Sequence, residues 1–299
     1  MSPELELFKK SHIYSKVGTL DALRVDLETL RTLDLHAEKQ SSIWAKVGCG
    51  GLALAVLAFC GGMFTEFAMA TALIICITVG GTFALVGFVM AWLEGKADVD
   101  NRRYELVLRV LQLIGKDSRQ DAQLSLHLDL RPPNHKHKFQ RQGMAGTWKV
   151  KHYTDVWLRL QGRLLDGTGY LLTMTDLHQD RGRWQRGSSG KQKYKTKTKC
   201  ATRAMIQLRV KPQRYPRLAT VSPKAGMLVR LPTWAICRKV ETHAAGVVLG
   251  VQTKSTWGVE YAGQKEKPVR KGDDLVAMMF LSSYQLLHAA KALDGQPGT

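Results

Sequence analysis

The stretch KQKYKTKTKC, residues 191–200, carries a lysine at every second position. The intervening even positions, from Tyr194 to Val210, hold apolar or small side chains. A period of two over about twenty residues, without glycine or proline, is typical of a β-strand, whose successive side chains point to opposite faces. The lysines are therefore predicted to line one face of a strand, rather than to form the flexible basic tail that lysine runs usually make.

Two similar segments precede this strand and predict an antiparallel meander. Turn-forming sequences at 166–169 (DGTG) and 187–190 (GSSG) separate alternating segments at 147–165, 170–186 and 191–211. The three segments have similar lengths, as neighbouring strands of one sheet should.

The pairing register can be predicted from the loop lengths. If each connection has four residues, Arg159 faces Asp176 and Asp180 faces Lys197, so both acids meet a base. Apolar residues also face one another in the pairs Leu164–Leu171, Leu158–Leu177 and Leu171–Ile206. Asp176, His178 and Asp180 then share one strand face, which we interpret as charge balancing in preference to a metal or acid–base site.

The same alignment predicts a projecting β-hairpin arm over residues 178–198, where both faces are polar. At about 3.3 Å per residue the arm is about 30 Å long. Basic side chains with interleaved aromatic rings suit a polyanion, with charge for phosphates and rings for bases or headgroups. Lysines that protect a sheet edge from unwanted pairing, or a contact between subunits, are the alternatives. The predicted anion-binding residues are Arg181, Arg183, Trp184, Arg186, Lys191, Lys193, Tyr194, Lys195, Lys197 and Lys199.

Positive charge is concentrated in this part of the chain. The net charge is +19, and residues 131–239 hold 25 Lys and Arg but four Asp and Glu. Such an excess attracts nucleic acid, acidic lipid or an acidic protein, or simply keeps the domain soluble. The five cysteines include no CxxC pair, which argues against structural zinc and a disulfide framework and fits a reducing compartment.

A long apolar region lies between Lys46 and Glu94, interrupted by the single charge of Glu66. It contains the runs VGCGGLALAVLAFCGGMF (47–64) and AMATALIICITVGGTFALVGFVMAW (68–92). At about 1.5 Å per residue these reach about 27 and about 37 Å, against a hydrocarbon core of about 30 Å. A two-span transmembrane hairpin is therefore predicted, rather than a buried helical pair in a soluble protein.

Basic residues flank the apolar region on both outer sides, whereas the connection at 65–67 has none. By the positive-inside rule, both termini are predicted to lie in the cytoplasm. Small residues spaced four apart let helix backbones approach closely, within one hairpin or between subunits. These predicted packing residues are Gly51 and Ala55, Gly80 and Ala84, and Gly87 and Ala91.

Amphipathic helices are predicted on either side of the hairpin. Thr19 can cap the first, and Val107, Leu111 and Ile114 form a stripe on the second. The two helices are predicted to pair as a short coiled-coil stalk. Beyond the arm, strands are predicted at 227–232, 234–242, 246–253 and 257–263, followed by a helix at 273–293.

Together these segments predict an α+β membrane protein, with a two-span transmembrane helical hairpin, flanking stalk helices and a cytosolic, mainly antiparallel β domain closed by a C-terminal helix. The predicted divisions are an amphipathic stalk helix at 1–46, the hairpin at 47–93, a second stalk helix at 94–117 and the basic β-rich domain at 118–299.

The sequence contains no recognisable catalytic motif, and the nearby His135 and His137 lack further metal ligands. No catalytic residue, metal or cofactor is therefore expected. The expected function is a non-enzymatic membrane anchor or sensor, which recruits nucleic acid or an acidic protein to the lipid bilayer. The alternative is an oligomeric pore-forming or membrane-perturbing assembly with the β domain as its platform. A homo-oligomer is expected as well.

Overall fold

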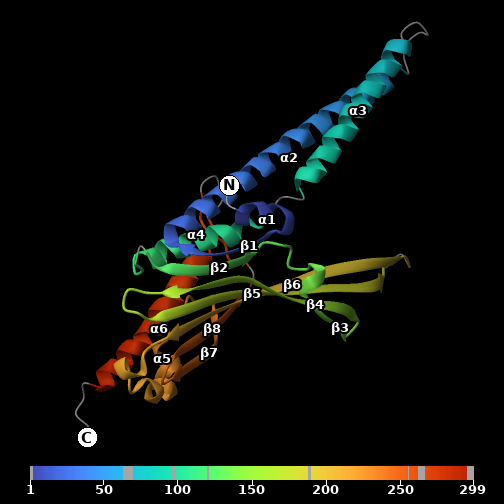
Figure 1. The fold of residues 1–299 in the computed structure, drawn as a ribbon. Helices are drawn as coiled ribbons and strands as arrows, with labels where there is room; N and C mark the ends of the chain where they lie inside the picture. Colours follow the sequence, from blue (N-terminus) through green and yellow to red (C-terminus); the bar gives the residue numbers. More distant parts are fainter. Residues whose placement is uncertain are drawn as a thin grey trace. The chain divides into compact units, whose positions relative to one another are not determined.

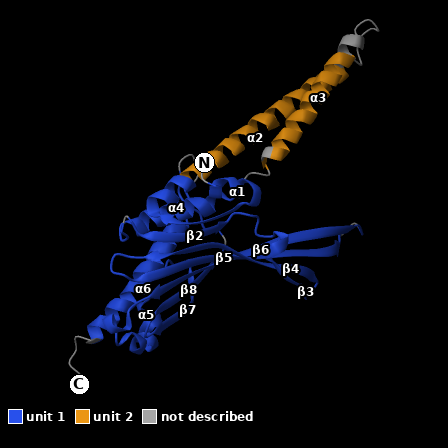
Figure 2. Cartoon of the chain, in the orientation of Figure 1, with its two compact units in different colours: residues 1–27, 100–299 blue, residues 28–99 orange. Residues whose placement is uncertain are grey.

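The computed structural model describes residues 3–62, 70–95, 99–119, 121–187, 190–254, 256–261 and 267–294. The chain divides into two compact units (Figure 2). Unit 1 comprises residues 1–27 and 100–299, and unit 2 comprises residues 28–99. The mixture of helices with an antiparallel sheet confirms that part of the predicted fold class.

Unit 1 is built on an antiparallel sheet (Figure 1). The strand order is β1-β2-β4-β5-β6-β8-β7, and β3 pairs with β4 off this path. The strands are β1 (Ile13–Thr19), β2 (Gln123–Asp129), β3 (Phe139–Ala145), β4 (Trp148–Arg163), β5 (Gly169–Arg186), β6 (Gln192–Arg209), β7 (Ile236–His243) and β8 (Gly246–Lys254).

Helices α4 (Asn101–Gly115) and α6 (Gly272–Asp294) cover one face of this sheet. The ring of Phe280 in α6 contacts Tyr170 of β5 edge-to-face, with 5.7 Å between ring centroids. Every second residue of β5 from Tyr170 to His178 is buried beneath these helices, while the alternate residues are half-buried. The apolar core of unit 1 therefore lies on a single face of the sheet.

The pairing registers of β4, β5 and β6 differ from the predicted ones. Both connections contain five residues instead of four, because Arg163 pairs with Gly169 and Arg186 pairs with Gln192. Asp180 consequently faces Thr198 instead of Lys197. The remaining predicted pairs change too: Arg159 faces Thr173, Leu158 faces Met174, Leu171 faces Gln207, and Ile206 faces Leu172.

A β-bulge in β4, which the alternating pattern did not predict, changes the faces of its residues. Trp157 is the extra residue between Val156 and Leu158, and its side chain is fully buried. A bulge shifts the alternation by one residue. Lys149 and Lys151 consequently lie on the same face of the sheet as Leu158. The alternating pattern predicted them on the other face.

The predictions for the C-terminal part were partly wrong. Strands β7 and β8 and helix α6 lie where they were predicted, but the segment 227–232 is not a strand. It includes the end of α5 (Ala225–Leu228), and the backbone of Arg230 hydrogen-bonds Ser282 of α6 in both directions, at 2.9 and 2.7 Å. In the predicted strand at 257–263, the described residues 257–261 form an isolated bridge between Gly258 and Lys271, and residues 262–263 lie outside the described part of the chain.

The N-terminal segment is not one continuous stalk helix. It forms α1 (Pro3–Ser11), the edge strand β1 and then α2 (Leu20–Gly62), which continues without a break into the first apolar run as far as residue 62. The predicted cap is present, with the Ala22 amide donating to the Thr19 hydroxyl at 3.4 Å. Tyr14 of β1 is buried, and its hydroxyl donates to Asp26 at 2.8 Å. These contacts place the first part of the chain in unit 1.

The predicted second stalk helix, α4, also belongs to unit 1. Nine of its fifteen residues are buried, including Val107, Leu111 and Ile114. This stripe packs within unit 1, because α4 lies against α6 and its Arg103 reaches Asp155 and Asp176 of the sheet. The basic domain therefore includes β1 and α4, and does not begin at residue 118.

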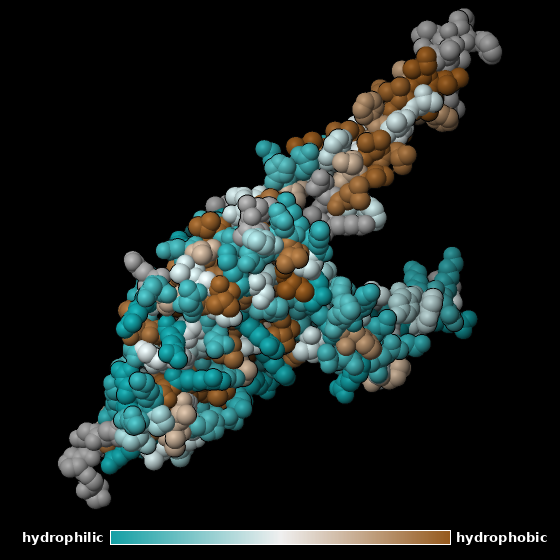
Figure 3. Space-filling view, in the orientation of Figure 1, coloured by the Kyte–Doolittle hydropathy of each residue, from teal (hydrophilic) through white to brown (hydrophobic). Residues whose placement is uncertain are grey.

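Unit 2 contains the rest of α2 and helix α3 (Ala70–Gly95). Both helices are long and apolar enough to cross a membrane, judged by length and composition alone. The most apolar 18-residue windows have mean hydropathies of 1.8 and 2.3, and only 11% and 17% of their residues are buried. Hydrophobic side chains accordingly gather on the surface of these helices in Figure 3. The connection at 65–67 lies outside the described residues.

The small residues predicted for helix packing lie where α2 and α3 touch. A Cβ added to Gly51 would come within 2.6 Å of the Ala84 nitrogen, and one on Gly80 would come within 2.9 Å of the Ala55 nitrogen. A Cβ on Gly87 would overlap the backbone of Gly48. The hydroxyl of Ser41 donates to the carbonyl of Ala91 at 3.2 Å. The helix faces that carry these small residues therefore pack α2 against α3 within the hairpin.

Candidate anion-binding surface

The β5–β6 hairpin extends beyond the other strands of unit 1 as the arm predicted from sequence (Figure 1). β4 accompanies β5 only as far as the Lys149–Gly182 pair, and β8 accompanies β6 only from Ala201 onward. Along residues 192–200, β6 is consequently an edge strand that carries the lysines. An edge of this kind is protected from unwanted pairing by its charge, whatever else the lysines bind.

Six of the predicted anion-binding residues share one face of the arm, which we call the lysine face. The pairs Arg181–Lys197 and Arg183–Lys195 place cations directly opposite one another across the two strands. Like charges at such positions repel one another and destabilise the pair. The lysine face consists of Arg181, Arg183, Lys193, Lys195, Lys197 and Lys199.

No carboxylate lies among the described residues that share this face on β3, β4, β5 and β6. Arg181 instead donates to Gln179 at 2.6 Å, and Arg183 donates to Gln185 at 3.1 Å. Neutral amides orient the two guanidinium groups but do not compensate their charge. The lysine face therefore presents a row of cations on two paired strands, without a compensating carboxylate among the described residues of that face.

The two aromatic residues predicted as stacking partners lie on the opposite face of the arm. Trp184 pairs with Tyr194 across the strands, and their ring centroids are 5.2 Å apart. The missing Cβ of Gly182 leaves room for the Tyr194 phenol, which a Cβ would overlap. Arg186 shares this face, while Lys191 precedes β6 and its carbonyl accepts from the Gly187 amide at 2.9 Å.

Trp148, which the sequence analysis did not select, supplies the aromatic ring of the lysine face. Trp148 of β4 precedes the Lys149–Gly182 pair and so lies beside Arg183 of β5. The guanidinium carbon of Arg183 is 4.4 Å from the centroid of the Trp148 ring. A guanidinium at this distance makes a cation–π contact. The sequence signal for Trp148 was hidden, because the unpredicted bulge in β4 reverses the face on which its side chain falls.

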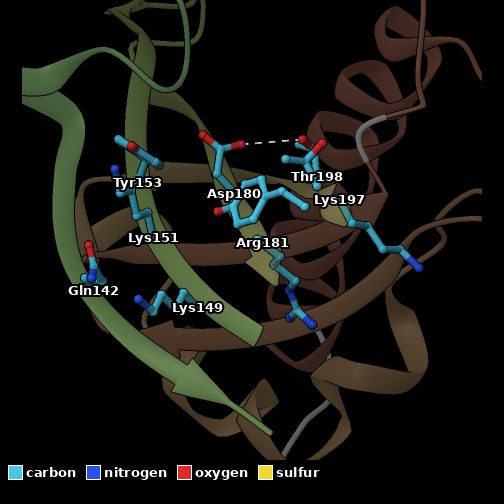
Figure 4. A pocket seen from close by; sticks show the side chains of 11 residues that line it. Gln142, Lys149, Lys151, Tyr153, Asp180, Arg181, Lys197 and Thr198 are labelled. Atoms are coloured by element: carbon cyan, nitrogen blue, oxygen red, sulfur yellow. Dashed lines mark hydrogen bonds between the residues drawn. The ribbon is translucent and has the colours of Figure 1, made fainter. Parts of the chain in front are cut away.

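A cavity of about 340 Å³ lies on the other face of the arm (Figure 4). Lys149, Lys151 and Tyr153 of β4 line one side, and Asp180 of β5 lies across from them. Asp180 accepts a hydrogen bond from the hydroxyl of Thr198 at 3.4 Å. The cavity is polar, mainly basic, and large enough for a small ligand.

A buried charge network connects the base of the arm to helix α4. Arg103 donates to Asp155 at 2.8 Å and to Asp176 at 2.9 Å, and Lys138 reaches Asp155 at 2.7 Å. Burial is the largest influence on Asp155 and raises its pKa, although both cations oppose it. The predicted partner of Asp176, Arg159, is therefore wrong. The actual partner, Arg103, lies one helical turn before Val107 on the apolar stripe of α4.

Asp129 extends this network at the end of β2. Burial favours its neutral form, but hydrogen bonds from Arg131 and the charge of Lys138 outweigh this, and the pKa of Asp129 is lowered. The Arg131 side chain donates to this carboxylate at 2.7 Å. The network therefore anchors the base of the arm through mutually compensated charges, unlike the lysine face.

No group of three or more metal-ligating side chains with suitable geometry occurs in the described ranges of the chain. His135 and His137 contact one another, with ring centroids 5.2 Å apart. Asp176, His178 and Asp180 lie on one face of β5 as predicted, but they have different partners. Asp176 binds Arg103 and Thr202, whereas His178 hydrogen-bonds Asp180.

Comparison of the chain with protein-family models, with curated proteins and with solved structures finds no match.

Proposed function

We propose that this protein is a membrane-anchored, non-enzymatic binder of single-stranded nucleic acid, with the lysine face as its contact surface. The observation that carries the proposal is the cross-strand pairing of Arg181 with Lys197 and of Arg183 with Lys195, without a carboxylate on the described part of that face. Bound phosphates would relieve this repulsion and release the counterions condensed on the nucleic acid.

The spacing of the cations favours an extended strand as the ligand. Side chains two residues apart on one face of a strand are separated by about 6.6 Å, a distance comparable to that between successive phosphates of an extended single strand. Lys193, Lys195, Lys197 and Lys199 thus form a row with a polymer-like period. Trp148 supplies a ring on which a base can stack, beside the Arg183 guanidinium.

Membrane anchoring is supported by the apolar surface of unit 2. Leu57, Phe59 and Leu85 are each more than 60% exposed, which is unfavourable in water but favourable among lipid chains. We infer that α2 and α3 span the bilayer as a hairpin. The basic residues outside the hairpin then favour a cytoplasmic position for both termini and for the arm.

The test is fluorescence anisotropy of the full-length protein in detergent micelles with a labelled, mixed-sequence single-stranded oligonucleotide. Tight binding at low salt is expected, with a logarithmic salt slope of about −0.7 per phosphate contacted. Replacing all four ladder lysines, Lys193, Lys195, Lys197 and Lys199, by Gln should weaken binding and reduce that slope by about 3 units.

The matched control replaces four exposed lysines elsewhere by Gln, namely Lys9, Lys10, Lys116 and Lys224. It has the same net charge as the ladder variant and should retain most of the affinity. Equal losses in both variants would mean that binding reflects only net charge. Absence of binding at low salt would overturn the proposal and leave an acidic protein as the partner to be sought.

Self-association remains a prediction, and so does the alternative of a pore-forming or membrane-perturbing assembly. Because Gly51, Gly80 and Gly87 pack within the hairpin, an oligomer would need another surface. The mass of the protein in detergent, measured by light scattering, distinguishes a monomer from the oligomer that a pore from two uncharged spans would require.

A further inference from the structure

Cys200, His178 and Asp180 form a continuous chain of hydrogen bonds at the base of the arm. The Cys200 sulfur lies 3.2 Å from Nδ1 of His178, and Nε2 of His178 lies 2.8 Å from Oδ1 of Asp180. His178 and Cys200 are directly opposed in the β5–β6 register. The three groups are therefore positioned by paired strands, which hold side chains more rigidly than loops do.

The chain of contacts fixes the direction of proton transfer. An ionised carboxylate only accepts hydrogen bonds, so Asp180 requires the imidazole hydrogen to be on Nε2. Nδ1 of His178 is then unprotonated and can accept the proton of the Cys200 thiol. A nucleophile, a base and a group that orients the base are the three parts of an activated cysteine.

From this geometry we propose that Cys200 is a reactive thiol, a site of covalent modification by small electrophiles that carry a negative charge. Its sulfur forms a bond to the electrophilic carbon as the bond from that carbon to the leaving group breaks. The thiol proton passes to Nδ1 of His178, and the leaving group departs with the bonding electrons. Asp180 is a positioning residue, which acts through His178.

The preference for an anion follows from the neighbouring cavity of Figure 4. Asp180 is one of its lining residues, and Lys149 and Lys151 lie across from it. These two ammonium groups have no ion-pair partner among the described residues. Lys151 faces Asp180, two residues from His178 on the same strand face, and the Tyr153 ring of the cavity contacts His178 with centroids 5.8 Å apart. A carboxylate or phosphate held by the lysines would therefore bring an electrophile to the His178 side of the cavity.

Cys237 provides a matched internal reference in the same molecule. Both cysteines are exposed, and burial of part of each side chain is the largest cause that raises the pKa of each thiol. Asp176 and Asp180 raise the pKa of Cys200 further, while Arg102 lowers it. Thiol acidity alone therefore predicts no advantage for Cys200. The Cys237 thiol instead donates a hydrogen bond to the Lys239 carbonyl at 3.9 Å, and a carbonyl cannot act as a base.

The test compares alkylation of the full-length protein by anionic iodoacetate and neutral iodoacetamide, with each cysteine quantified by peptide mass spectrometry. Cys200 should react with iodoacetamide at least about 10-fold faster than Cys237. This is a conservative expectation, because a positioned general base typically accelerates a reaction by about 100-fold or more. The variant His178→Asn should remove this advantage. Iodoacetate should show a larger preference for Cys200, which Lys149→Gln combined with Lys151→Gln should abolish without slowing iodoacetamide.

Two further variants separate activation from folding. Asp180→Asn should slow alkylation of Cys200, because an amide no longer fixes the imidazole tautomer, and Asp180→Glu should restore part of the rate. Cys237 serves as the folding control in every sample. Equal rates at Cys200 and Cys237 in the unmodified protein, or a rate at Cys200 unaffected by His178→Asn, would overturn the proposal and leave a structural thiol–imidazole hydrogen bond.

Discussion

Arg103 of α4 donates at 2.9 Å to Asp176 of β5, which lies 73 positions further along the sequence. The same guanidinium nitrogen reaches Asp155 of β4 at 2.8 Å, so one cation from a helix compensates acids on two neighbouring strands. Both carboxylates and the arginine are almost completely buried. This contact joins α4 to the base of the arm and makes the helix part of the basic domain.

Removal of the arginine should therefore destabilise unit 1 strongly. Arg103→Met leaves Asp155 and Asp176 buried without their shared cation, and should lower the free energy of unfolding by about 3–5 kcal/mol. Urea unfolding, followed by tryptophan fluorescence of the full chain in detergent, measures the change. The control is Arg109→Met, which replaces an exposed arginine of the same helix. It should lower the free energy of unfolding by only about 0.5 kcal/mol. Similar values for the two variants would contradict the structural role of Arg103.

Asp129 should make the stability dependent on pH. Its pKa is lower in the folded protein than the ordinary value of 3.8. A lowered pKa contributes stability above the unfolded-state pKa, and this contribution is lost as the pH falls through the folded-state pKa. The native protein should exceed Asp129→Asn in unfolding free energy at pH 7, and the difference should shrink below about pH 4. A difference that stays constant from pH 7 to pH 3 would show that ionisation of Asp129 is not involved.

Trp148 should contribute to nucleic-acid affinity by stacking. Trp148→Ala is expected to weaken oligonucleotide binding by about 1–3 kcal/mol while the salt slope stays unchanged, because no phosphate contact is lost. Trp184→Ala is the matched control, since its ring lies on the opposite face of the arm. Anisotropy titrations at several salt concentrations measure both quantities. A larger loss for Trp184→Ala would move the contact surface to the other face.

The helical hairpin offers a comparison between adjacent glycines. Gly51→Leu should separate α2 from α3, because a Cβ there meets the backbone of Gly80 and Ala84, whereas Gly50→Leu should be tolerated because nothing lies within 4 Å. Disulfide cross-linking between Ser41→Cys and Ala91→Cys, in a background with Cys49, Cys60 and Cys76 replaced by Ala, reports the separation. Loss of cross-linking in the Gly51 variant alone is expected, and equal efficiency in both variants would contradict this packing.

The arm illustrates both the strength and the limit of sequence periodicity. The lysines at alternate positions identified β6 as a strand, because a period of two has no other regular backbone form. The sequence did not contain the exact loop lengths, and each connection is one residue longer than predicted. The β5–β6 register consequently shifts by one residue, and Trp184 pairs with Tyr194 on the face opposite the lysines.

The helices of unit 1 show a second limit. An apolar stripe on α4 correctly indicated that one side of the helix is buried, but a stripe does not identify its partner. The partner is the sheet together with α6, joined by the ion pairs of Arg103. The edge strand β1 was missed for a related reason, since its short segment lies between two helices and is stabilised by pairing with β2.

The sequence by itself determined the strands β4 to β6, the closing helix and the two long apolar helices, because these depend on local periodicity and on the length of apolar runs. The tertiary structure decided which side chains meet. A single bulge residue, Trp157, and one extra residue in each turn set the faces of three strands. Those small displacements placed Trp148 beside Arg183 and Cys200 beside His178, contacts between distant segments that no local pattern encodes.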